Sequence, residues 1–273
     1  MTRQEIYDLV ETAKHLGFLE VVYFGGEPLM REDITDLIRF SSSRGLLTSI
    51  YTNGILLSRK FAKELRDAGL FYCNVSLDSS SPEQHNRLRG YKGCFEKAEE
   101  GIKYLTEVGV QCSIWTYVKK EDVKDGDLLD LKALIEKARQ LKVRNVVILF
   151  PIASGNWLCG AKNVLTLEER EKVRLLHDPP FVAMEFPKED AHCCAGDKMV
   201  YITPQGAVSP CPTIPHFFGD IRKEPFVTIL ERMYKDFVET TVGGCGECVM
   251  NQNTFREKIG MNILEKDQII NHK

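Results

Sequence analysis

Apolar residues alternate between two spacings along the first 160 positions of the chain. Apolar residues at helical spacing predict helices over 4–16, 31–43, 59–68, 94–108 and 128–141. Continuous runs rich in β-branched and aromatic residues predict strands over 19–24, 46–51, 70–77, 110–118 and 143–150. Strands that alternate with helices of this length are typical of βαβ units, so we expect an α/β fold with a parallel sheet.

The pattern changes after residue 160. One helix is predicted over about 167–176, and a connector with three prolines follows it. The next stretch is short, turn-rich and rich in cysteine, with one amphipathic helix near 225–237. We therefore predict a barrel-like domain at 1–160 and a linker with a helix at 161–190. A small cysteine-rich domain at 191–255 and a polar tail at 256–273 follow.

Composition and charge exclude several classes of protein. The chain has 36 Lys and Arg against 39 Asp and Glu, so it lacks the positive surplus that binding to nucleic-acid phosphates requires. The longest apolar run, 146–153, is far shorter than the ~20 residues of a membrane-spanning helix. The first residues lack the apolar segment of a signal peptide. We therefore expect a cytoplasmic protein with no nucleic-acid or membrane partner.

Unusual polar and glycine residues follow three successive predicted strands. These residues are Gly25, Gly26, Glu27 and Pro28 after the first strand, Asn53 after the second, and Ser76 and Asp78 at the third. The carboxyl ends of parallel strands meet at one edge of a sheet, so these groups are expected to converge. Each is also compatible with a tight turn or a helix cap. Their joint position favours a ligand site in which the carboxylate of Glu27 binds an amine and Asp78 binds sugar hydroxyls.

The chain contains nine cysteines. Because this number is odd and the sequence shows no export signal, reduced thiols and metal ligation are favoured over disulfides. Cys73 and Cys112 lie in apolar predicted strands and are expected in the core. The cysteines of the second domain lie among glycine, proline and polar residues, and four thiolates suit either Zn²⁺ or an iron–sulfur cluster. These candidate ligands are Cys194, Cys211, Cys245 and Cys248, with Cys193 as the substitute to consider.

Taken together, these motifs resemble the radical SAM superfamily with a C-terminal SPASM or twitch-type domain. Residues 24–29, Phe-Gly-Gly-Glu-Pro-Leu, are similar to the family's Gly-Gly-Glu-Pro motif. Residues 76–95, from Ser-Leu-Asp through His-Asn-Arg-Leu-Arg-Gly to Gly-Cys-Phe, resemble a second family motif. The interval from Cys194 through Gly206 to Cys211 is similar to the SPASM signature Cys-x(9–15)-Gly-x4-Cys.

The resemblance implies a partial (β/α)6 TIM-like barrel, missing its first strand, that holds S-adenosylmethionine, followed by a small domain that holds one auxiliary 4Fe–4S cluster. In this chain Glu27 would hold the methionyl amine, Ser76 and Asp78 the ribose, and Asn53 would lie at the rim. The implied activity is that of an oxidoreductase or maturase that abstracts hydrogen from a peptide or small-molecule cofactor precursor. An electron donor is the implied partner.

One family feature is missing from the sequence. The radical-generating 4Fe–4S cluster of the superfamily is held by Cys-x3-Cys-x2-Cys after the first barrel strand, and no such triplet occurs in the 273 residues. Three explanations are a truncated reading of a longer enzyme, a degenerate homologue, or half of a split enzyme completed by a separate chain. The intact S-adenosylmethionine motifs favour truncation. The alternative to an enzyme is a non-catalytic iron–sulfur or ligand-binding remnant that serves electron transfer or peptide binding.

Overall fold

The computed structural model describes residues 1–124, 127–154, 163–186, 188, 192–241 and 246–260. The chain divides into two compact units. We call the first the sheet unit, which consists of Thr2–Leu149 and Leu176–Glu185. We call the second the cysteine unit, which consists of Met1, Phe150–Leu175 and Phe186–Lys273.

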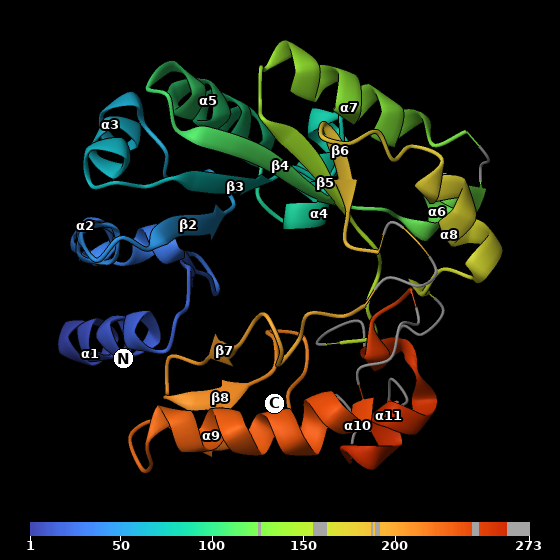
Figure 1. Cartoon of the computed structure of the whole chain (residues 1–273). Coiled ribbons are helices and arrows are strands. Elements are labelled where there is room, and N and C mark those ends of the chain that lie inside the picture. The colour runs from blue at the N-terminus through green and yellow to red at the C-terminus, as the bar shows by residue number, and fades with distance from the viewer. Residues whose placement is uncertain (125–126, 155–162, 187, 189–191, 242–245, 261–273) are drawn as a thin grey trace. The chain divides into compact units, whose positions relative to one another are not determined.

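The sheet unit is built on six parallel strands that pair in the order in which they occur along the chain. Every connection therefore crosses to the neighbouring strand, as in a βα barrel, and all carboxyl ends lie along one edge of the sheet (Figure 1). The strands are β1 (Glu20–Tyr23), β2 (Leu47–Thr52), β3 (Tyr72–Ser76), β4 (Gln111–Tyr117), β5 (Asn145–Leu149) and β6 (Val182–Met184).

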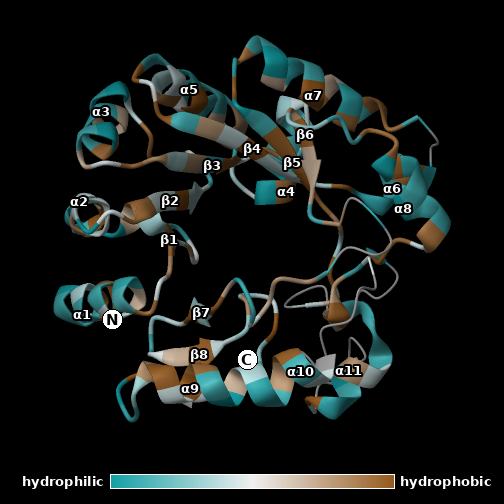
Figure 2. Ribbon diagram, in the orientation of Figure 1, coloured by the Kyte–Doolittle hydropathy of each residue, from teal (hydrophilic) through white to brown (hydrophobic). Residues whose placement is uncertain are grey.

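Helices cover one face of this sheet (Figure 1). Their apolar sides, brown in Figure 2, alternate with hydrophilic sides, as expected for helices that pack on a sheet. The helices on this face are α2 (Ile34–Ser43), α3 (Arg59–Asp67), α5 (Cys94–Glu107) and α7 (Leu129–Gln140). Helix α1 (Arg3–His15) contacts α2, and the short helices α4 (Pro82–Arg89) and α6 (Lys120–Lys124) follow the carboxyl ends of β3 and β4. Over the described part of the chain, no helix is long and apolar enough to cross a membrane.

Strand β6, helices α4 and α6, and a 3₁₀ helix at Pro28–Met30 were not predicted from the sequence. Strand β6 lies in the stretch that was assigned to the linker, because three residues are too few to show a periodic pattern. Its pairing with β5, from Val146 opposite Val182 onward, identifies it as a strand. Helix α4 was missed because His85 is its only buried residue, although Ser81 and Pro82 are typical helix-start residues.

The cysteine unit contains a three-stranded antiparallel sheet and several short helices. The single helix predicted near 225–237 is instead interrupted, because a π-helical turn at Tyr234–Val238 separates two α-helical segments. Helix α11 begins before the predicted polar tail and ends within it, and residues 261–273 of that tail lie outside the described residues. The elements are α8 (Leu167–Arg174), β7 (Tyr201–Ile202), β8 (Ala207–Ser209), β9 (Gly219–Asp220), α9 (Phe226–Met233), α10 (Glu239–Thr241) and α11 (Asn253–Lys258).

Cys73 and Cys112 lie in the core of the sheet unit, as predicted. They are directly opposite each other on β3 and β4, and both are buried. Burial raises the pKa of the Cys112 thiol to about 12 and that of Cys73 well above its ordinary value. These two cysteines are therefore small apolar packing residues of the core.

The loop after β2 packs against α5 with almost no space between them. A β-carbon added at Gly101 would lie 2.8 Å from Leu57 Cβ and 3.2 Å from the Gly54 carbonyl oxygen. At Gly54 itself, φ is +78° and a β-carbon would lie 3.0 Å from Ala98 Cα. Two glycines thus let the loop that carries Asn53 rest directly on the helix.

We expect Gly101→Ala to destabilise the sheet unit. Alanine is favoured over glycine in a helix by about 1 kcal/mol, but crowding against Leu57 costs about 1–3 kcal/mol. Urea unfolding of Gly101→Ala measures the balance, with Glu100→Ala on the exposed side of α5 as the control. Higher stability for Gly101→Ala would contradict the close packing.

Candidate functional site

The carboxylate of Glu27 joins the carboxyl ends of β1 and β2. Its Oε1 accepts hydrogen bonds from the Thr52 hydroxyl at 2.7 Å and the Leu29 N–H at 3.0 Å. Its Oε2 accepts one hydrogen bond, from the Asn53 N–H at 2.8 Å. A carboxylate oxygen can accept two hydrogen bonds, so Oε2 retains capacity for one more donor, such as an ammonium group.

The glycines before Glu27 give the loop an unusual backbone. Gly25 has a φ of +130°, which L side chains rarely adopt. A β-carbon at Gly25 or Gly26 would meet no described atom within 4 Å, so the space beside this turn is open. Pro28 begins a 3₁₀ helix that Glu27 caps through Oε1. The same carboxylate therefore acts as a cap with one oxygen and offers the other to a ligand.

Asp78 lies just beyond the end of β3, and its two carboxylate oxygens differ. Oδ2 forms an ion pair with Arg89 Nε at 2.6 Å. Oδ1 is buried and has no hydrogen-bond partner among the described residues. A buried oxygen without a donor is unfavourable, so this oxygen fits a ligand hydroxyl such as those of a ribose.

His85 holds the backbone of the same loop. Its Nδ1 accepts a hydrogen bond from the Asp78 N–H at 3.1 Å, which requires that Nδ1 carry no proton. Burial lowers the pKa of His85 and so favours this neutral form. His85 thus positions Asp78 without competing for its carboxylate.

A charged network fixes the segment after Asp78. Lys119 Nζ contacts Asp130 Oδ2 at 2.6 Å and the Asp78 carbonyl oxygen at 3.2 Å. Asp130 Oδ1 accepts from the Ser79 hydroxyl at 2.9 Å and from the Ser80 N–H at 2.8 Å. Burial raises the pKa of Asp130, but the hydrogen bonds from Lys119 and Ser80 outweigh it and leave the pKa below its ordinary value. The sequence analysis missed Asp130, because its position on α7 gives no sign of contact with β3.

The other predicted residues take different positions. The Asn53 side chain accepts the Ile55 N–H at 2.9 Å within its own loop, so only its backbone reaches Glu27. Ser76 is the last residue of β3 and lies opposite Trp115 on β4. The Trp115 ring meets Tyr51 edge to face at 4.7 Å, on the side of the sheet that carries the more exposed residues. The structure therefore joins Glu27 to the Asn53 backbone by a hydrogen bond, and places Ser76 at the end of the adjacent strand β3 and Asp78 just beyond it.

The predicted cluster ligands lie on loops of the cysteine unit. Cys194 is exposed and Cys211 and Cys248 are buried, whereas Cys245 lies outside the described residues. The Gly196 N–H donates to the Pro210 carbonyl at 3.1 Å, which ties the Cys194 loop to the segment before Cys211. Within the ranges that the structure describes, no three His, Cys, Asp or Glu side chains form a metal-binding group.

The chemistry of the cysteine unit nevertheless suits an iron–sulfur cluster. Sulfur ligands are supplied from turn-rich loops, and the Cys211 sulfur lies 3.0 Å from the Thr213 hydroxyl. Gly196 and Gly246 adopt left-handed conformations beside cysteines, with φ of +77° and +59°. Glycine allows these left-handed turns, which let the chain bend sharply next to the candidate ligands.

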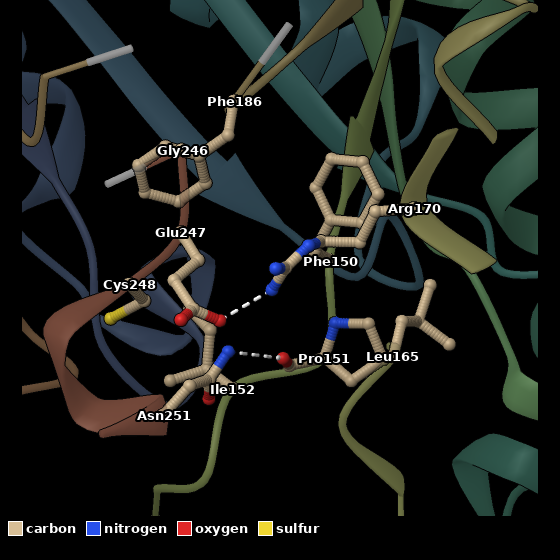
Figure 3. Close-up of a pocket in the computed structure, with 10 residues that line it drawn as sticks. All are labelled: Phe150, Pro151, Ile152, Leu165, Arg170, Phe186, Gly246, Glu247, Cys248 and Asn251. Carbon is tan, nitrogen blue, oxygen red and sulfur yellow. Dashed lines mark hydrogen bonds and ion pairs between the residues drawn. The ribbon is translucent and has the colours of Figure 1, made fainter. Parts of the chain in front are cut away.

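The loop of Cys248 is held by two arginines of α8 that the sequence analysis missed. Arg170 forms an ion pair with Glu247 across a small pocket (Figure 3). Arg174 is buried and donates to the Gly246 carbonyl at 3.0 Å and to the Phe186 carbonyl at 3.1 Å. The sequence offered no signal for this contact, because charged residues on a short helix normally face solvent.

Replacement of Asp130 tests the charged network. Asp130→Asn removes a charge-assisted hydrogen bond with Lys119, for an expected loss of about 2 kcal/mol in unfolding free energy at pH 7. The folded-state pKa of Asp130 is depressed, so its contribution is complete above its unfolded pKa of about 3.9 and is lost as pH falls below that value. Urea unfolding at several pH values measures this difference. A difference that grows on acidification would contradict the assignment.

Two family models match the chain. Residues 1–132 match the radical SAM superfamily, and residues 193–249 match SPASM, an iron–sulfur cluster-binding domain. Proteins of these families bind S-adenosylmethionine and 4Fe–4S clusters, which agrees with the cofactors expected from the motifs.

Curated relatives with assigned activities align with most of this chain. An Fe-coproporphyrin III synthase of Methanosarcina barkeri is 29% identical over 201 residues, which cover 71% of this chain and 49% of that protein. An AdoMet-dependent heme synthase of the same organism is 26% identical over 91% of this chain and 79% of its own length. The chain thus spans about half the length of the first relative and most of the second.

A solved structure shows the same fold. Streptococcus suis SuiB, in complex with the precursor peptide SuiA, superimposes with a TM-score of 0.66 at 16% sequence identity. The match covers 87% of this chain and 59% of that chain. The parallel sheet, the strand-end motifs and both family matches agree: this chain belongs to the radical SAM superfamily and carries a SPASM iron–sulfur domain.

Proposed function

We propose that this chain is the cofactor-binding part of a radical SAM oxidoreductase or maturase. It binds S-adenosylmethionine at the carboxyl ends of β1–β3 and one auxiliary 4Fe–4S cluster in the cysteine unit. The observation that carries the proposal is the Glu27 carboxylate, which follows β1, is fixed by hydrogen bonds from the end of β2 and keeps acceptor capacity on Oε2. A fixed anion beside an open glycine turn is suited to the α-amino group of the cofactor.

In this proposal, different strand ends bind different parts of S-adenosylmethionine. Asp78 Oδ1 accepts a ribose hydroxyl, which supplies the donor that this buried oxygen lacks in the protein. Ser76 lies two residues earlier, at the end of the same strand, and adds a hydroxyl. The turn of Gly25, Gly26 and Pro28 leaves its backbone open to the methionyl part of S-adenosylmethionine. Asn53 lies beside this part of the site, at the end of β2.

The proposed role of these residues is binding and orientation. In radical SAM proteins, reductive cleavage of S-adenosylmethionine supplies a 5′-deoxyadenosyl radical that abstracts hydrogen. The 273 residues contain no Cys-x3-Cys-x2-Cys triplet, so we assign no radical-generating step to them. The proposed auxiliary cluster is held by Cys194, Cys211, Cys245 and Cys248, and an external electron donor reduces it.

The proposed substrate is a peptide or a cofactor precursor. Two curated relatives are named for heme and coproporphyrin synthesis, which supports a cofactor precursor. The SuiB structure contains a precursor peptide, which supports a peptide. A purely binding role is the second candidate, because the missing cysteine triplet favours it. The two differ once the chain is assayed together with the segment that supplies the cysteine triplet: an oxidoreductase or maturase then releases 5′-deoxyadenosine under reducing conditions, whereas a binding module releases none.

Glu27→Gln tests the proposed amine site. The variant keeps an oxygen for Thr52 but loses the charge that pairs with the ammonium group. Loss of a charged hydrogen bond of about 1.5–3 kcal/mol corresponds to a roughly 10- to 100-fold weaker Kd for S-adenosylmethionine. Isothermal titration calorimetry of the anaerobically reconstituted protein measures it, with Glu32→Gln, an exposed glutamate nearby, as the control. Equal affinity in Glu27→Gln and wild type would overturn the assignment.

Cys211→Ser tests the proposed cluster. We expect the wild-type chain to hold roughly four irons after anaerobic reconstitution, and the variant to lose most of its iron and its cluster absorption. Cys94→Ser is the matched control, because Cys94 is also buried but lies on α5 of the sheet unit. Unchanged iron content in Cys211→Ser would refute this ligand assignment.

A further inference from the structure

The sulfur of Cys211 has a hydroxyl neighbour that no motif identifies. Thr213 Oγ1 lies 3.0 Å from Cys211 Sγ, which is within hydrogen-bonding distance for sulfur. Cys211 is buried and Thr213 is half-buried, so the contact is partly shielded from water. When Cys211 is a protonated thiol, either the thiol or the Thr213 hydroxyl is able to donate this hydrogen bond. A sulfur that ligates iron carries no proton, so the hydroxyl of Thr213 is then the donor.

The backbone around Cys211 holds Thr213 in this position. Residues 211–214 form a turn that is closed by the Ile214 N–H and the Cys211 carbonyl at 3.3 Å. Pro212 occupies the second position of the turn, which its fixed φ favours. The hydroxyl of Ser209 donates to the same Cys211 carbonyl at 3.1 Å, and Ile214 is fully buried. The turn therefore directs the Thr213 side chain back toward the cysteine.

A distant segment of the cysteine unit supports the turn. The hydroxyl of Ser154 donates to the Thr213 carbonyl at 2.7 Å. The neighbouring Ala153 N–H donates to Asn251 Oδ1 at 2.9 Å, three residues beyond Cys248. Residues 153–154 thus contact both the Cys211 turn and the segment that follows Cys248. Ser154 is a positioning residue for Thr213.

We infer that Thr213 sets the reduction potential of the auxiliary cluster by donating a hydrogen bond to a ligand sulfur. The inference depends on the proposed function, because it requires that Cys211 ligate the cluster. One-electron reduction takes the cluster from the 2+ to the 1+ state and increases the negative charge on its sulfurs. A hydrogen bond to sulfur stabilises that reduced state more than the oxidised state, so it raises the potential.

Thr213→Val is the direct test, because valine keeps the shape of threonine and removes the hydroxyl. Thr213→Ser keeps the hydroxyl, and Thr228→Val makes the same change at an exposed position of α9. The full chain is reconstituted anaerobically and titrated with dithionite, and EPR follows the reduced cluster. We expect full iron content in all three variants, a more negative midpoint potential in Thr213→Val, and potentials near wild type in Thr213→Ser and Thr228→Val.

Two results would overturn the inference. A wild-type midpoint potential in Thr213→Val with full iron content would show that the hydroxyl does not tune the cluster. Loss of iron in Thr213→Val would show that Thr213 serves cluster assembly instead. Failure of the proposed function is recognised separately, because Cys211→Ser would then retain its iron. Iron loss in Cys211→Ser together with an unshifted Thr213→Val potential would overturn only the tuning role.

Discussion

Parallel pairing of six strands in chain order is the constraint on which the sheet unit depends. Each strand must be followed by a helix that returns the chain to the opposite edge, so every strand ends at the same edge of the sheet. Loops that are 25 or more residues apart in sequence therefore become neighbours. The hydrogen bonds from Thr52 and Asn53 to Glu27 are a direct consequence of this arrangement.

The strand-end loops are fixed by polar contacts as well as by packing. Glu27 ties β1 to β2, while Lys119 and Asp130 tie the loop after β3 to β4 and α7. Most of the acceptors in these networks have partners, whereas Asp78 Oδ1 and, on β4, Thr116 Oγ1 are buried without a hydrogen-bond partner among the described residues. An unsatisfied oxygen in a loop that other contacts restrain suits ligand binding, because a ligand hydroxyl would supply the donor that the protein lacks.

The cysteine unit has little regular structure, and hydrogen bonds between its loops and short helices add to the packing of its buried apolar residues. Arg174 holds the Gly246 carbonyl near Cys248, and Ser154 holds the Thr213 carbonyl near Cys211. Side chains from residues 150–175 therefore support the loops of Cys211 and Cys248. A cluster would therefore bind to loops whose backbone is held by residues that are not ligands themselves. Such surrounding residues orient metal ligands and adjust the electronic properties of the metal site.

The sequence by itself determined the alternation of helices and strands, the burial of Cys73 and Cys112, and the motifs that identify the family. These features are local, since hydrophobic period and motif spacing are encoded within short windows. Only the tertiary structure decided the sixth strand, the partners of Glu27, and the role of Asp130 in the loop after β3. Ser154 and Thr213 are 59 residues apart, and no periodic pattern links them. Such contacts depend on how the whole chain packs, and so they become visible only once it has folded.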